Sequence, residues 1–131
     1  MKFLLDTDIC IYVINERPVR VLGQFRKHAV EDVGISSITA AELAFGVEKG
    51  KSARNREALA TFLLPLEVAP FDQLAASAYG AVRAGLERRG SPIGPLDLLI
   101  AAHALSIGAI LVTNNLKEFR RVDALRCENW A

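Results

Sequence analysis

The segment KFLLD, residues 2–6, predicts a short buried strand that stops at a carboxylate. Successive side chains of a strand point to opposite faces of a sheet, so an unbroken apolar run such as Phe3–Leu5 is typical of a parallel strand buried on both faces. Asp6 then follows the carboxyl end of the strand, where ligands bind in open parallel sheets. The segment therefore predicts a sheet covered on two sides, with a polar group at one edge.

The rest of the chain alternates between strand-like and helix-like segments. Further strands are predicted over residues 33–36, 66–68, 109–113 and 125–130, the last as an edge strand. Helices are predicted over residues 9–15, 19–28, 37–49, 52–64, 72–89 and 94–107, with Ser37 as a cap, Gly50 as a stop and Gly94-Pro95 as a start. This order predicts one domain over residues 1–131, of the α/β class. The expected architecture is a three-layer α/β/α sandwich with a short, mostly parallel central sheet.

Composition limits the functions that the chain can have. Its 131 residues fit one domain, and a net charge of +1 means that any surface binding nucleic acid is local. The longest apolar stretch, residues 96–112, is interrupted by Asp97 and His103 and is shorter than the ~20 residues of a membrane span. The apolar run at the N-terminus is too short for a signal peptide. Cys10 and Cys127 are expected to be reduced thiols, with a disulfide left open, so the protein is expected to be soluble and cytoplasmic.

Two further carboxylates lie in apolar surroundings. Glu42 is in the middle of a predicted helix and has no cationic residue three or four positions away. Asp97 falls in the first turn of another helix, between apolar neighbours. Ordinary explanations are a Glu42 that reaches solvent and an Asp97 that interacts with the helix dipole. The alternative is that both face Asp6 and form one acidic site.

The residue types of that site indicate its chemistry. Asp6, Glu42 and Asp97 supply carboxylate oxygens, and Asn114 and Asn115 follow the strand over residues 109–113 at the same sheet edge. Hard oxygen ligands without His or Cys favour Mg²⁺ or Mn²⁺ over zinc. A divalent ion activates water and neutralises charge at a phosphodiester, so the sequence predicts a metal-dependent nuclease.

Five segments, in this order and spacing, resemble a known family. They are LLDTDI (residues 4–9), SITAAEL (37–43), PIGPLD (92–97), LVTNN (111–115) and the tail LRCENW (125–130). Together they are similar to the PIN-domain toxins of bacterial VapBC toxin–antitoxin modules. The resemblance covers essentially the whole chain.

The resemblance implies roles for individual residues. By it, Asp6 and Asp97 bind Mg²⁺ or Mn²⁺, Glu42 completes the acidic cluster, and Asn115 is the fourth catalytic residue. It implies an endoribonuclease that cleaves tRNA, with the anticodon stem-loop of initiator tRNA as the leading substrate. It also implies a VapB-type antitoxin that inserts into the acidic site. We expect a homodimer and a higher assembly with the antitoxin, and, from the short apolar stretches, no association with membranes.

The chain departs from the family pattern at two places. Asp8 stands where the family usually has Asn, which adds a negative charge beside Asp6. The fourth position is Asn115 rather than Asp, and Glu118 either supplies the missing charge or is an ordinary surface residue. The roles of Asp8, Asn114 and Glu118 stay open at this stage.

Other residues have less specific interpretations. His103 is expected in the core or against a partner, and Trp130 is expected to anchor the last strand. The apolar run of Leu59, Phe62, Leu63 and Leu64 belongs either to the core or to a groove for a partner. Some basic residues are expected to bind RNA phosphates, from the set Lys49, Lys51, Arg54, Arg56, Arg83, Arg88, Arg89, Lys117, Arg120 and Arg121.

Three other functions remain as alternatives. A strand ending in Asp6-Thr7-Asp8 also occurs in haloacid-dehalogenase-like phosphatases, where the first Asp is the nucleophile. That class also needs a downstream Lys and a Gly-Asp pair, which the chain does not convincingly supply. The second alternative is a catalytically inactive PIN-like binding module, which would have no need of three acidic residues with apolar neighbours. The third is a nuclease of the same fold that cleaves DNA; the short chain favours RNA as the substrate.

Overall fold

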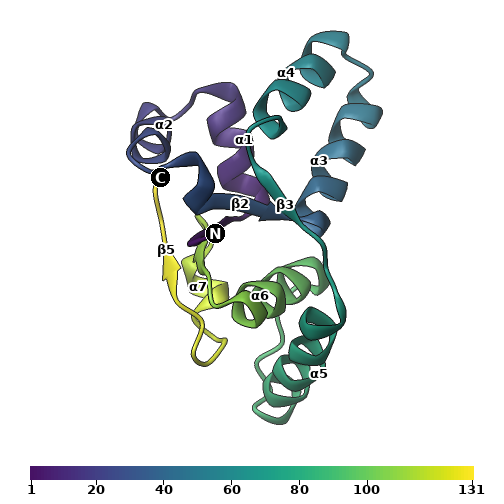
Figure 1. Cartoon of the computed structure of the whole chain (residues 1–131). Helices are drawn as coiled ribbons and strands as arrows, with labels where there is room; N and C mark the ends of the chain where they lie inside the picture. Colours follow the sequence, from purple (N-terminus) through teal and green to yellow (C-terminus); the bar gives the residue numbers. More distant parts are fainter.

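The computed structural model describes residues 1–131 and shows a central sheet with helices on both sides (Figure 1). Every pair of neighbouring strands is parallel, in the order β3-β2-β1-β4-β5. The predicted α/β class and three-layer arrangement are confirmed, and the sheet is parallel throughout. The strands are β1 (Phe3–Leu5), β2 (Val33–Ser36), β3 (Glu67–Ala69), β4 (Ile110–Val112) and β5 (Cys127–Glu128).

Helices connect the strands and cover the two faces of the sheet. Helices α1 to α4 lie in the upper half of Figure 1, and α5 to α7 lie in the lower half. The helices are α1 (Thr7–Asn15), α2 (Val19–Arg26), α3 (Ser37–Gly50), α4 (Ala53–Leu63), α5 (Gln73–Arg88), α6 (Pro95–Ile107) and α7 (Leu116–Phe119), with a 3₁₀ turn η1 at Val30–Asp32. None of them has the length and apolar character that a membrane crossing requires.

The apolar core consists of two clusters, one on each face of the sheet. Phe3 and Leu5 of β1 belong to the cluster beneath α1 to α4, whereas Leu4 belongs to the cluster beneath α5 to α7. All three side chains are nearly or fully buried, which confirms a strand buried on both faces. Trp130 packs against Phe3, with ring centroids 5.3 Å apart, so it anchors the end of the chain as predicted. His103 is 1% exposed and lies in the core.

Several predicted boundaries differ from the observed ones. Helix α1 begins at Thr7, because the carboxylate of Asp6 accepts the backbone N–H of Thr7 and caps the helix. The cap of α3 is Ser36 rather than Ser37, since Ser36 has the extended backbone of an N-cap and its hydroxyl accepts the N–H of Ile38. Gly50 is the last residue of α3, and the left-handed residue that ends the helix is Lys51, with φ of 53°.

Short elements account for most of the remaining differences. Helix α7 was not predicted, because its four residues are too few to show a helical period. The last strand is limited to Cys127–Glu128 and pairs in parallel with β4. Both cysteines are free thiols, with Cys10 buried and Cys127 half-buried.

Candidate active site

Asp6 lies at the carboxyl end of β1 with 6% of its surface exposed. Its Oδ1 accepts the backbone N–H of Thr7 at 2.8 Å, and its Oδ2 accepts the hydroxyl of Thr113 at 2.7 Å. Burial raises the pKa of Asp6 to about 6; the charges of Asp8 and Glu42 add to this, whereas the two hydrogen bonds act in the opposite direction. Asp6 is thus fixed in position while its negative charge remains uncompensated.

Glu42 approaches Asp6 from helix α3. Its side chain is half-buried, and Oε1 accepts a hydrogen bond from the hydroxyl of Thr7 at 2.8 Å. Its negative charge acts on both Asp6 and Asp97, raising the pKa of each. Glu42 therefore faces the other acids, and a side chain that only reaches for solvent is the wrong description.

Asp97 lies in the first turn of α6 and is in contact with Glu118 of α7. Burial raises the pKa of Asp97 to about 7; the hydrogen bond with Glu118 and the charges of Asp6, Glu118 and Glu42 add to this. The pKa of Glu118 is lowered, mainly because its side chain accepts that hydrogen bond. The pKa of Asp97 is therefore raised and that of Glu118 lowered by the same contact. Asp97 thus faces three other carboxylates, which the helix dipole alone would not require.

Glu118 makes two further contacts that define its place in the site. Its Oε1 accepts the backbone N–H of Gly94 at 2.7 Å, and its Oε2 accepts the side-chain amide of Asn115 at 2.6 Å. Asn115 is exposed, and its amide points to Glu118. The structure therefore places Glu118 against Asp97 and Asn115 behind Glu118. Asn115 and Glu118 are three residues apart, a spacing that brings side chains together on a helix. The sequence alone does not show that this segment is helical, so the contact could not be predicted from it.

Asp8 and Asn114 form the outer rim of the site. The Oδ1 of Asp8 accepts the N–H of Ile9 at 2.7 Å, and its Oδ2 accepts the N–H of Asn114 at 3.1 Å. The side-chain amide of Asn114 donates to the hydroxyl of Tyr12 at 3.1 Å. Burial raises the pKa of Asp8, whose charge in turn acts on Asp6. Asp8 thus connects α1 to the segment after β4 and adds to the negative charge.

No basic side chain forms an ion pair with these acids, although the charge of Arg121 contributes to the lowered pKa of Glu118. The ion pairs of the chain are Arg56–Glu48, Arg83–Glu87 and Arg89–Asp123, and none includes a carboxylate of the site. Carboxylates that raise one another's pKa without a cationic partner form a region of strong negative potential. Such a region attracts a cation.

The donors fit a hard divalent ion in their chemistry. All are oxygens, and the charge of Asp6 raises the pKa of Asp97, a repulsion that an ion between them would relieve. No three acidic, His or Cys side chains are gathered into a complete metal-binding group as they stand. Mg²⁺ does not need one, because it usually keeps several waters and binds through one or two carboxylates. Asp6 and Asp97 as its ligands stay a prediction.

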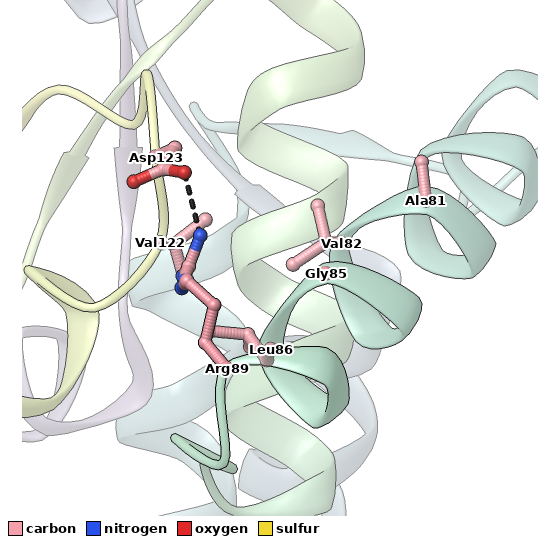
Figure 2. Close-up of a pocket in the computed structure, with 7 residues that line it drawn as sticks. All are labelled: Ala81, Val82, Gly85, Leu86, Arg89, Val122 and Asp123. Atoms are coloured by element: carbon pink, nitrogen blue, oxygen red, sulfur yellow. Dashed lines mark hydrogen bonds and ion pairs between the residues drawn. The ribbon is translucent and has the colours of Figure 1, made fainter.

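The structure divides the basic residues that were candidates for binding RNA. Figure 2 shows Arg89 at a pocket of about 200 Å³ between α5 and the segment after α7, where it contacts Asp123 at 2.6 Å. Arg56 and Arg83 also have carboxylate partners. The remaining candidates form no ion pair: Lys49, Lys51, Arg54, Arg88, Lys117, Arg120 and Arg121.

A groove of about 310 Å³ opens beside Glu42, between α1, α3 and α4. Thr7 and Glu42 are among its lining residues, and its apolar lining includes Ile11, Leu43 and Leu59. Leu59 lines the groove and also packs against the core, as Phe62 and Leu63 do, whereas Leu64 is 87% exposed. The groove leads from an apolar region to the acidic site.

Comparison with known proteins identifies relatives along the whole chain. A family model described as PIN domain matches residues 3–125. The tRNA(fMet)-specific endonuclease VapC of Shigella flexneri is 43% identical, over 100% of this chain and 99% of the relative. Ribonuclease VapC2 of Haemophilus influenzae is 46% identical, over 99% of this chain and 98% of the relative.

Two solved structures with the same fold are VapBC toxin–antitoxin complexes. The crystal structure of VapBC2 from Rickettsia felis bound to a promoter DNA fragment contains a chain with a TM-score of 0.91 and 42% identity, covering 100% of both chains. The DNA-bound VapBC from Salmonella typhimurium has a TM-score of 0.92 and 42% identity, covering 100% of this chain and 99% of that one.

Proposed function

Because this chain belongs to the PIN-domain family, in the group of VapC ribonuclease toxins, we propose that it is a metal-dependent endoribonuclease that cleaves tRNA. One observation carries the proposal. Asp6, Glu42 and Asp97 come from distant parts of the sequence, act on one another electrostatically, and have no basic partner. A cluster of uncompensated acids is costly to a fold and is explained by a bound cation.

Each acid has a distinct part in the proposed reaction. Asp6 and Asp97 would hold Mg²⁺ or Mn²⁺, which when bound neutralises charge on the phosphodiester and lowers the pKa of water. Asp6 is kept in position by Thr7 and Thr113. Glu42, fixed through Oε1, has Oε2 available to orient a water molecule.

The substrate proposed for this chain is initiator tRNA, cut in the anticodon stem-loop. Support comes from the relative that is described as a tRNA(fMet)-specific endonuclease. Because tRNA is found in the cytoplasm, we place the protein there.

The test is to incubate purified protein with labelled initiator tRNA, an elongator tRNA and a DNA hairpin, with Mg²⁺, with Mn²⁺ or with EDTA. Cleavage of initiator tRNA alone, abolished by EDTA, is the expected result. Cleavage that persists in EDTA would contradict a metal-dependent mechanism, and cleavage of DNA would move the substrate to a different class. Sequencing of the products gives the position of the cut.

The proposed partner is a VapB-type antitoxin that occupies the groove and the acidic site. The structural neighbours are complexes with antitoxins. The groove combines an apolar lining with the carboxylate of Glu42, so it suits an amphipathic segment that carries an Arg. Leu59→Asp in the groove is expected to abolish neutralisation of toxicity by the co-expressed neighbouring gene. If neutralisation persisted, the antitoxin would bind elsewhere.

The other expectations have unequal support. Membership of the PIN family leaves the haloacid-dehalogenase-like alternative without support, and aspartyl-phosphate trapping on Asp6 would be negative. A catalytically inactive binding module is tested by the cleavage assay itself. The homodimer stays a prediction; Phe45 and Leu74, exposed by 66% and 70%, are large apolar side chains that a second copy would cover.

A further inference from the structure

Thr7 contacts two of the acids that meet at the site. Its backbone N–H donates to Oδ1 of Asp6 at 2.8 Å, and its hydroxyl donates to Oε1 of Glu42 at 2.8 Å. Asp6 is the residue before it, whereas Glu42 is 35 positions away on α3. One residue therefore links a carboxylate at a strand end to a carboxylate on a helix.

The direction of the hydroxyl contact follows from proton counting. A threonine hydroxyl has one proton to donate, and an ionised carboxylate can only accept. Thr7 also lies 3.4 Å from the hydroxyl of Thr39, which is fully buried. Since the shorter contact is to Glu42, the proton of Thr7 goes to Glu42. The hydroxyl of Thr39 is then left to donate to Thr7, and the three groups form a directed chain from Thr39 through Thr7 to Glu42.

Glu42 needs such a contact because little else restrains it. Its side chain is half-buried, forms no ion pair, and lines the groove of about 310 Å³ into which it could rotate. A glutamate side chain has several rotamers of similar energy, and fixing one of them is opposed by the loss of conformational entropy. The hydroxyl of Thr7 engages Oε1 and leaves Oε2 for the reaction.

We infer that Thr7 is a positioning residue for cleavage, which acts by holding the carboxylate of Glu42 against the site. The inference rests on the proposed ribonuclease function. It concerns orientation alone: Thr7 does not touch the RNA, and it acts through Glu42.

The test compares Thr7→Val, which keeps the branched shape but has no donor, with Thr7→Ser, which keeps the donor. Thr7→Val is expected to lower kcat for RNA cleavage by about 10- to 100-fold with little change in KM, because the reacting groups are misplaced while RNA still binds. Thr7→Ser is expected to stay within about threefold of wild type, since the hydrogen bond is retained. Thr61→Val, the same change at an exposed position of α4, is the matched control and is expected to have no effect.

A double-mutant cycle distinguishes positioning from a general loss of structure. If Thr7 acts through Glu42, Thr7→Val causes no further loss in a Glu42→Gln background. A full additional loss in that background would overturn the inference. So would a Thr7→Val protein that cleaves at the wild-type rate.

A readout without activity separates this inference from the proposed function. Crystal structures of the metal-free wild-type and Thr7→Val proteins are expected to show the Glu42 carboxylate turned toward the groove only in the variant. If the wild type cleaved no RNA but the carboxylate moved, the proposed function would fail while the positioning role stood. A Glu42 that kept its place in Thr7→Val would refute the positioning role whatever the activity.

Discussion

The pocket beside α5 and the acidic edge of the sheet differ in how their charges are neutralised. At the pocket, Arg89 forms an ion pair with Asp123, and the two side chains are 42% and 86% exposed. At the edge, Asp6 is 6% exposed and has no cationic partner. A solvated pair contributes little to stability and is typical of protein surfaces. A buried carboxylate without a cation is destabilising to the fold on its own, so its presence indicates a function.

The same contrast separates the polar contacts of the two regions. Arg89 also donates to the backbone carbonyl of Arg121, so its guanidinium has both a carboxylate and a carbonyl partner. At the edge, hydroxyl and N–H donors from Thr7 and Thr113 fix the geometry of Asp6 but supply no positive charge. The protein therefore fixes the position of the Asp6 carboxylate but does not neutralise its charge, which a bound cation would do.

The largest expected effect is the loss of cleavage in Asp97→Asn. The substitution keeps the shape of the side chain but removes a metal-binding charge, so the rate of tRNA cleavage is expected to fall by about 1,000-fold or more. Single-turnover assays with labelled tRNA measure the rate, and circular dichroism verifies the fold. Asp123→Asn is the matched control at the ion-paired pocket and is expected to cleave as wild type does. Equal rates in the two variants would remove the distinction between the two regions.

Metal binding is expected to stabilise one region and not the other. Mn²⁺ at tenfold above its Kd stabilises a folded protein by about 1.4 kcal/mol, which corresponds to a rise in Tm of about 5 °C for a domain of this size. Wild type and Asp123→Asn are expected to show this rise, and Asp97→Asn is expected to show less than half of it. Differential scanning fluorimetry with and without EDTA measures the shift. The same shift in all three proteins would indicate that the ion binds outside the acidic edge.

Local sequence signals were sufficient for much of the fold. The apolar segment of β1, the Gly94-Pro95 start of α6 and the alternation of strands with helices are determined by neighbouring residues, and the structure confirms them. The position of Asp6 at a strand end, and hence at the ligand-binding edge, followed directly from this pattern.

The rest of the site depends on contacts between distant segments. Thr7 and Thr113 are small polar residues with no distinguishing neighbours, and their importance appears only when the fold places their hydroxyls within 2.8 Å of Glu42 and 2.7 Å of Asp6. The sequence alone leaves open whether Glu118 belongs to the site, because α7 is a single turn and shows no helical period. The sequence shows which residues are acidic, but only the contact of Glu118 with the start of α6 shows which acid meets Asp97.

A smaller effect is expected from substitution of Glu118, which tests whether this residue contributes to the acidic site. As a partner of Asp97, it is expected to contribute about 10- to 100-fold to cleavage, and Glu118→Gln would lose that contribution. Asn115→Ala removes a contact to Glu118 rather than to the other acids, so a loss of about threefold is expected. The same tRNA assay measures both. If Asn115→Ala lowered the cleavage rate more than Glu118→Gln, Asn115 rather than Glu118 would be the fourth catalytic residue.

The smallest expected effect is the coupling between Arg89 and Asp123. Urea unfolding of wild type, Arg89→Ala, Asp123→Ala and the double variant gives the interaction free energy, expected to be about 0.5 kcal/mol and to decrease at high salt. The value is small because both side chains are partly solvated and lose conformational freedom when they pair. A coupling above about 2 kcal/mol, insensitive to salt, would mean that this pair is as desolvated as the acids at the sheet edge. Burial alone would then not distinguish the carboxylates of the acidic site from Asp123. The only remaining difference would be that Asp123 has a cationic partner and the acids of the site have none.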